Sequence, residues 1–119
     1  MSELKEYVTQ IQDQSNVHIS EDAIFTVCAM AAVEVEGVAG LSHIGSDVAS
    51  AKKNLSKAVR VRGVEGGVAV DVSIQVRFGS NIQDVAKAVQ EAVRASVTDI
   101  IGLTPSSVNV YVSSISLED

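Results

Sequence analysis

The stretch from Gly63 to Val112 constrains the fold more than any other part of this chain, because it has the pattern of strand, tight turn, strand, helix and strand. Between Val70 and Phe78, apolar and polar residues alternate at every position, and Val68 continues the apolar side. This period predicts a strand with one buried side and one solvent-facing side. The residues expected on the buried side are Val68, Val70, Val72, Ile74, Val76 and Phe78.

A second half-buried strand is expected just before this one. Val59 and Val61 alternate there with Arg60 and Arg62. The Glu65-Gly66-Gly67 segment that follows predicts a hairpin turn, since glycine readily adopts the positive φ angles of such turns. The two strands should therefore pair antiparallel.

A helix should follow the long strand. Ser80, with Gln83 three residues later, has the spacing of a capping box, and Gly102 with Pro105 should end the helix. Its expected apolar stripe consists of Ile82, Val85, Ala86, Val89, Val93, Val97 and Ile100.

The last strand is expected from Val108 to Val112, and Ile115 and Leu117 then break the alternation, which predicts a bulge. A crossover helix between two strands of one sheet predicts that those strands are parallel.

The N-terminal half has weaker signals. Residues 1–15 are polar with a faint helical spacing, and we expect a loosely ordered segment there. Val17 and Ile19 predict a short edge strand. Ser20 should cap a helix that ends at Gly37, and residues 39–56 should be a mostly mobile connector with one short helix near Ser46.

Together these elements predict one α+β domain over residues 16–117. Its fold class is a two-layer sandwich, with two helices packed on one face of a small mixed β-sheet. The expected order is helix, strand, strand, helix, strand, preceded by the short edge strand. At 119 residues the chain has room for one core and not for a separate catalytic module.

Composition narrows the classes of function. Aromatic residues make up 3% of the chain and Trp is absent, which disfavours a pocket for stacking a flat cofactor. The longest apolar run, Ala23 to Val33, falls well short of the roughly 20 residues that cross a bilayer. An acidic N-terminus and a single cysteine favour the cytoplasm. We expect no direct membrane insertion.

The net charge of −6 is uneven, because residues 52–77 carry six basic residues against two acidic ones. This basic segment is interpreted as solvated surface or as a contact for an acidic partner. Nucleic-acid binders usually have a net basic domain or stacking aromatic residues, so we expect no nucleic-acid site.

Residues that could carry chemistry are sparse. Cys28 lies on the apolar stripe of the first expected helix, as a buried hydrophobe would. His18 and His43 have no Cys or carboxylate at ligand spacing beside them. The pair Glu34 and Glu36 should point to different sides of a helix. We therefore predict no enzyme activity, no catalytic residues, no metal and no cofactor.

The polar face of the sheet is the candidate binding surface. It should present three arginines and several hydrogen-bonding groups, and Arg and Tyr are favoured anchors in protein interfaces. A solvated sheet remains the alternative at this stage. The expected partner-binding residues are Arg60, Arg62, Arg77, Gln75 and Tyr111.

Several phrases in order resemble one family over Val17 to Ile115. They are NVHIS, EVEGVAGL, GVAVDVSIQVRFGSNIQDVAKAVQEAV and IIGLTPSSVNVYV. Together they are similar to the alkaline shock protein (Gls24-type general stress protein) family of Gram-positive bacteria.

The resemblance implies a non-catalytic cytoplasmic adaptor or scaffold. Such a protein would support cell-envelope homeostasis or stress response, and a membrane-anchored partner would recruit it to the inner face of the membrane. Self-association into a homo-oligomer is also expected.

Two alternative functions stay open at this stage. Shorter members of such a family could regulate a lipid-metabolic enzyme. The element order also resembles a KH RNA-binding module, but a KH module needs a GXXG loop between helices, which this sequence lacks.

Overall fold

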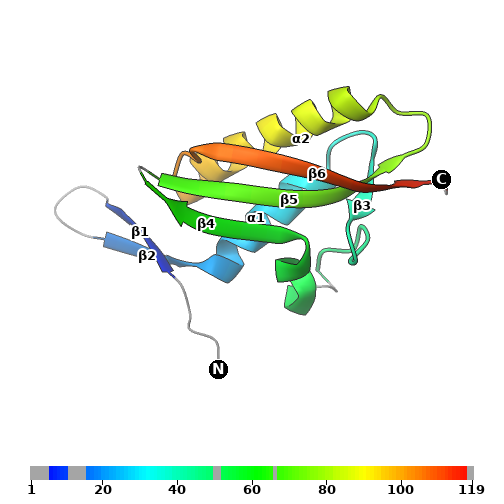
Figure 1. Ribbon diagram of the computed structural model, residues 1–119. Helices are drawn as coiled ribbons and strands as arrows, with labels where there is room; N and C mark the ends of the chain where they lie inside the picture. The colour runs from blue at the N-terminus through cyan, green and yellow to red at the C-terminus, as the bar shows by residue number, and fades with distance from the viewer. Residues whose placement is uncertain (1–5, 11–15, 50–51, 66, 118–119) are drawn as a thin grey trace.

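A computed structural model describes residues 6–10, 16–49, 52–65 and 67–117. The main sheet contains four strands, and two α-helices cover one of its faces (Figure 1). In chain order the elements are β1 (Glu6–Gln10), β2 (Asn16–Ser20), α1 (Glu21–Val33), β3 (Val38–Leu41), the 3-10 helix η1 (Lys52–Lys57), β4 (Val59–Val64), β5 (Gly67–Arg77), α2 (Ile82–Ser96), the π-helical turn η2 (Val97–Ile101) and β6 (Ser107–Ser116).

Strand β5 is the centre of the sheet. β4 pairs antiparallel with its first half and β3 with its second half, along the same edge. β6 pairs parallel with β5 along the opposite edge. The predicted hairpin, the predicted parallel pair and the α+β class with a mixed sheet are thus confirmed.

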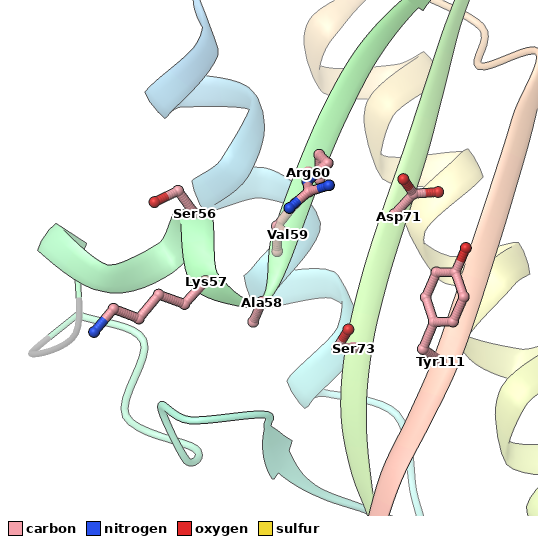
Figure 2. A pocket seen from close by; sticks show the side chains of 8 residues that line it. All are labelled: Ser56, Lys57, Ala58, Val59, Arg60, Asp71, Ser73 and Tyr111. Atoms are coloured by element: carbon pink, nitrogen blue, oxygen red, sulfur yellow. The ribbon is translucent and has the colours of Figure 1, made fainter. Parts of the chain in front are cut away.

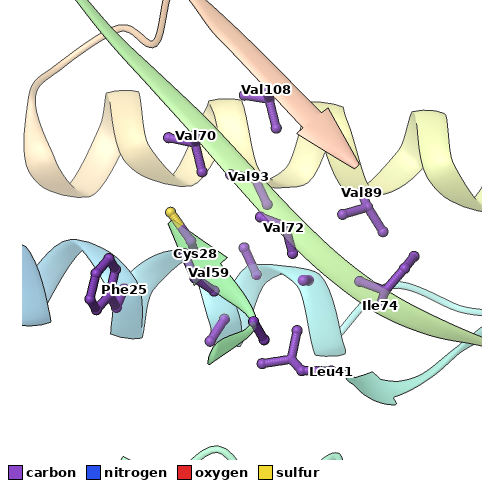
Figure 3. Packing of buried hydrophobic residues seen from close by; sticks show 14 of the residues in the cluster. Phe25, Cys28, Leu41, Val59, Val70, Val72, Ile74, Val89, Val93 and Val108 are labelled. Atoms are coloured by element: carbon purple, nitrogen blue, oxygen red, sulfur yellow. The ribbon is translucent and has the colours of Figure 1, made fainter. Parts of the chain in front are cut away.

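The core lies between β5 and the two helices (Figure 3). Val70, Val72, Ile74 and Val76 are all 0% exposed, as the alternation of the strand predicts. Phe78 is the exception, because it is 75% exposed. The strand ends at Arg77, and the chain then turns at Gly79, whose φ is +98°, so the predicted alternation stops one residue before Phe78.

The N-terminal segment differs from expectation. Glu6–Gln10 form strand β1, so the helical spacing inferred there is wrong. The strand predicted at Val17 and Ile19 exists as β2, but it pairs with β1 in a separate two-stranded hairpin and is not an edge of the main sheet. Residues 1–5 and 11–15 lie outside the described residues.

Helix α1 starts as predicted, since Ser20 Oγ accepts a hydrogen bond from the Ala23 amide at 3.2 Å. It ends at Val33, earlier than predicted. Gly37 instead has a φ of +97° in the turn that leads into β3. A Cβ at Gly37 would lie 2.6 Å from Val85 of α2, so the glycine also permits close packing of the two elements.

The expected connector is more ordered than predicted. Its first residues belong to β3, a strand too short to show a clear period. Val48 and Leu55, the two expected anchors, are both buried. The short helix that contains Leu55 is η1, and it begins at Lys52 and not near Ser46.

The turn between β4 and β5 spans Glu65 and Gly66, of which Gly66 lies outside the described residues. Gly67 opens β5 opposite Val64 and does not have the expected positive φ. Its lack of a side chain is needed for a different reason, because a Cβ there would lie 2.5 Å from Ser106 Oγ.

Helix α2 begins one residue later than predicted, since Asn81 and not Ser80 accepts the capping hydrogen bond from the Asp84 amide. The buried apolar stripe of the helix also differs from the predicted one at both ends. Ile82 is 44% exposed, and Ile100 is 69% exposed whereas Ile101 is 7% exposed. The wider π-helical turn of η2 rotates the next residue inward.

The last strand is longer than predicted, but its bulge is confirmed. The β5–β6 register shifts between Ile74 and Gln75, so that Ser113 has no partner in the register while Val112 and Ser114 do. Gly102, with a φ of +88°, ends the helical segment as expected. Within the described ranges, every helix is too short or too polar to cross a bilayer.

Replacing Ile101 with alanine should destabilise the protein by about 2–5 kcal/mol, because it removes buried methylenes from the core. Replacing Ile100 with alanine should change the free energy of unfolding by less than about 0.5 kcal/mol, because that side chain is solvent-exposed. Urea denaturation of the two variants measures both values. Equal losses would contradict the shifted stripe.

Candidate functional site

The open face of the sheet is the face opposite the helices. Along β5, the residues on either side of Asp71, Ser73 and Gln75 are buried, so these three side chains point away from the core. Arg77 is exposed at the end of the same row. β4 adds Arg60 and Arg62, and β6 adds Asn109 and Tyr111. The five residues expected to bind a partner therefore lie on one face, as their alternation predicts.

A hollow of about 220 Å³ lies on this face, beside the start of β4 (Figure 2). Arg60 lies on one side of it and Tyr111 on the other, with Asp71 and Ser73 of β5 between them. The segment that leads from η1 into β4 forms the remaining wall. The full lining is Ser56, Lys57, Ala58, Val59, Arg60, Asp71, Ser73 and Tyr111.

One ion pair fixes the charge pattern of the open face. Arg62 Nε donates to Asp71 Oδ2 at 2.9 Å, and Arg62 Nη2 donates to Asp71 Oδ1 at 3.2 Å. Asn109 Nδ2 donates to Asp71 Oδ1 at 2.9 Å. The directly paired residue of Arg62 is Ala69, whose small side chain lets the guanidinium reach diagonally to Asp71. β4, β5 and β6 are thereby tied together through side chains.

This network sets the protonation of its members. Hydrogen bonding to Arg62, helped by Asn109 and by the charges of Arg62 and Arg60, lowers the pKa of Asp71 below its ordinary 3.8, against a smaller opposing effect of burial. The same hydrogen bond raises the pKa of Arg62. The one acid in the hollow is thus already matched by a cation.

The remaining two arginines are not matched in this way. Arg60 is the direct neighbour of Asp71 across the strands, yet Arg62 makes the hydrogen bonds. Arg77 lies farther along β5, past Gln75. In the part of the chain that the structure describes, neither Arg60 nor Arg77 forms a salt bridge. Arg60 therefore acts on Asp71 through its charge, without the hydrogen bonds that Arg62 makes.

Reasoning from the sequence missed two residues of the hollow, Ser56 and Lys57. Ser56 is the last residue of the expected connector and Lys57 follows it, at a place where no period marks them. Their closeness in sequence to Arg60, within one basic segment, is the signal that could have included them. The Lys57 side chain extends away from Arg60 and Tyr111 (Figure 2), so Arg60 is the cation nearest the centre.

The β6 bulge has its own hydrogen bonds. Ser113 Oγ donates to the Ile74 carbonyl at 3.2 Å and lies at hydrogen-bond distance from Ser42 Oγ. Ser42 is a buried polar residue, 3% exposed, on the chain that follows β3. The Ser113 hydroxyl therefore holds β6 to β5 and to the turn after β3.

The other residues weighed as chemical groups lie apart from the hollow. Cys28 is fully buried in α1, and burial raises the pKa of its thiol to about 12. His18 is in the N-terminal hairpin, and His43 has a φ of +68° in the turn after β3. Among the described residues, no three His, Cys, Asp or Glu side chains gather as a metal site.

The lowered pKa of Asp71 predicts a pH dependence of stability. The ionised carboxylate stabilises the fold above the ordinary pKa of 3.8, and this contribution is lost as the pH falls through the lower folded-state value. The difference in free energy of unfolding between the native protein and Asp71→Asn should therefore be constant above about pH 5 and shrink below it. A constant difference down to about pH 2 would contradict the ion pair.

The raised pKa of Cys28 predicts an unreactive thiol. At pH 7 the folded protein should not react with iodoacetamide, because the thiol is both buried and protonated. The protein unfolded in urea should react fully. Mass spectrometry of both samples measures the labelled fraction, and rapid labelling of the folded chain would contradict this burial.

Comparison with solved structures shows the same fold. A two-substitution variant of MamM-CTD superposes with a TM-score of 0.50 at 23% identity, over 81% of this chain and 95% of that one. A single-substitution variant of the same domain gives 0.50 at 24% identity, over 79% and 96%.

Sequence relatives cover most of the chain. The uncharacterized protein Spy1614 of Streptococcus pyogenes is 36% identical over 83% of this chain and 86% of its own length. The uncharacterized protein YloU of Bacillus subtilis is 34% identical over 83% and 87%. YqhY, also from Bacillus subtilis, is 30% identical over 86% and 78%.

The model of the alkaline shock protein 23 family, described as a family with a cell envelope-related function, matches residues 9–117. This match confirms the resemblance that the spaced sequence phrases indicate. It also covers every residue of the hollow and of the open face. The chain belongs to the alkaline shock protein 23 family.

Proposed function

We propose that this protein is a non-catalytic adaptor that serves the cell envelope by binding another protein through its open sheet face. The observation that carries the proposal is the unmatched guanidinium of Arg60 beside a polar hollow. Asp71 offsets this charge only in part and makes no salt bridge with it, because its oxygens already accept hydrogen bonds from Arg62 and Asn109.

The chemistry of the hollow favours an acidic segment of a partner. Arg60 offers a planar set of donors that matches a carboxylate, and the hydroxyl groups of Ser56, Ser73 and Tyr111 can add hydrogen bonds. Tyr111, 54% exposed, provides apolar area next to this charge. Arg77 and Gln75 extend the same surface along β5, whereas Arg62 acts through Asp71 to hold the strands in place.

The cellular setting in this proposal is the cytoplasmic face of the membrane. A protein partner anchored in the membrane would hold the adaptor there, since the described helices do not cross a bilayer. The family's cell envelope-related function supports such a location. The binding itself requires no reaction and no cofactor.

Replacing Arg60 and Arg77 together with glutamate should reduce recovery of the partner at least about tenfold, because each exchange replaces an attractive charge with a repulsive one. The assay is crosslinked affinity purification from native cells, followed by mass spectrometry. Lys87→Glu is the matched control, since Lys87 is exposed on α2, in the layer opposite the open face. Arg62 is left unchanged because its replacement would break the Asp71 ion pair.

The identity of the captured molecule decides between functions. A membrane protein lost in the double variant and kept in Lys87→Glu would support the adaptor. A soluble lipid-metabolic enzyme with the same dependence would indicate a regulatory subunit acting through this face. Captured RNA whose affinity falls steeply with salt would favour the KH-like alternative. Unchanged recovery of the partner by the double variant would rule out the open face as the binding surface.

A further inference from the structure

Strand β6 forms an open edge of the main sheet. It runs over ten residues, Ser107–Ser116, and among the described strands it pairs with β5 alone. In Figure 1 it lies along the outer side of the sheet, with α2 behind it. The main chain on its outer side is therefore available for pairing with a further strand.

Exposed sheet edges are usually protected, and charged residues or proline are the common means. The β4 half of the opposite edge follows this rule with Arg60 and Arg62. The short, uncharged β3 half is instead partly covered by the turn that follows it, where Leu41 forms a β-bridge with Gly45. β6 does not follow the rule, because no Asp, Glu, Lys or Arg occurs between Asp99 and Glu118. In a chain with 20% charged residues, this long uncharged stretch leaves the edge open to association.

Two features limit the length of β6 that can pair with another strand. Gln90 Nε2 of α2 donates to the Val108 carbonyl at 3.1 Å, and the bulge at Ser113 interrupts regular pairing near the other end. Between them lies a regular segment, Asn109–Val112. Tyr111 stands at its centre with a half-exposed ring.

From this edge we infer that β6 pairs antiparallel with β6 of a second copy of this chain, which joins the two sheets across a two-fold axis. The net charge of the chain is the reason to expect a second copy as the partner of this edge. Each copy carries a net charge of −6, so contact through most surfaces brings like charges together, whereas two β6 strands meet without any charge.

The two-fold axis places Tyr111 near its own counterpart. In an antiparallel pair centred on Tyr111 the two tyrosines lie directly opposite, and in one centred on Val110 each tyrosine faces Asn109 of the other copy. Both arrangements bury part of the Tyr111 ring and keep the two open faces on the same side. The dimer would thus present two copies of the hollow to a partner.

The test is the mass of the native protein in solution. Size-exclusion chromatography with light scattering should give twice the chain mass of 12.5 kDa, falling toward the monomer on dilution. Tyr111→Lys should be a monomer at concentrations where the native protein is a dimer, because it places two cations at the axis. Gln75→Lys is the control, since it adds the same charge on the same face but on the central strand.

A disulfide provides a second measurement. In the register centred on Tyr111, the Cα atoms of the two Tyr111→Cys copies should approach to about 5 Å, so oxidation should give a covalent dimer. In the register centred on Val110 they lie about 7–8 Å apart and should not crosslink, so this measurement distinguishes the two registers. Gln75→Cys should stay monomeric on a denaturing gel, and the buried Cys28 should not compete.

A native protein that is monomeric at millimolar concentration would overturn the inference, as would a Tyr111→Lys variant that dimerises like the native protein. Circular dichroism of each variant confirms that it is folded. The inference does not depend on partner binding, because Arg60→Glu with Arg77→Glu should leave the dimer intact. Its failure is therefore distinct from a failure of the adaptor proposal.

Discussion

The burial of one side of β5 is the constraint on which the rest of the structure depends. Its four central apolar side chains are removed from water, and both of its edges are paired, so β3, β4, β6 and the two helices are all positioned by contact with this strand. Burial of each valine or isoleucine side chain contributes roughly 1.5–3 kcal/mol. The open face is the geometric consequence, because a strand with a buried side must present its alternate residues to the other side.

On that open face, hydrogen bonds and charge separate the arginine that stabilises the sheet from those that can contact a partner. Asp71 lies opposite Arg60 but accepts hydrogen bonds from Arg62 and Asn109. Arg62 therefore helps to hold the strands together, whereas Arg60 remains at the edge of the hollow. Three arginines that look equivalent in the alternation therefore have different roles. Removing Arg62 would take away two of the three side-chain hydrogen bonds that Asp71 accepts, whereas removing Arg60 would change the surface and leave the strands connected.

The two edges of the sheet differ in the same way. β4 has charges that discourage further pairing, whereas the ten residues of β6 have none, so an acidic chain has a long uncharged edge at which a copy can approach without repulsion. A protein-binding face and a self-pairing edge that meet at Tyr111 fit an adaptor that assembles while it holds a partner. The family's cell envelope-related function is consistent with such an assembly.

The sequence by itself determined the hairpin of β4 and β5, helix α2, the parallel strand β6 with its bulge, the buried Cys28, the family, and the five residues of the open face. These features rest on local period, turn residues and ordered phrases, which a single chain segment carries. Only the tertiary structure decided the rest. β3 is a strand because β5 has a free half-edge to pair with, and Glu6–Gln10 are extended because they pair with β2. The π-helical turn that buries Ile101, the partner of Asp71 and the hollow beside Lys57 also depend on distant segments, because packing and pairing across the chain have no signal in the local pattern.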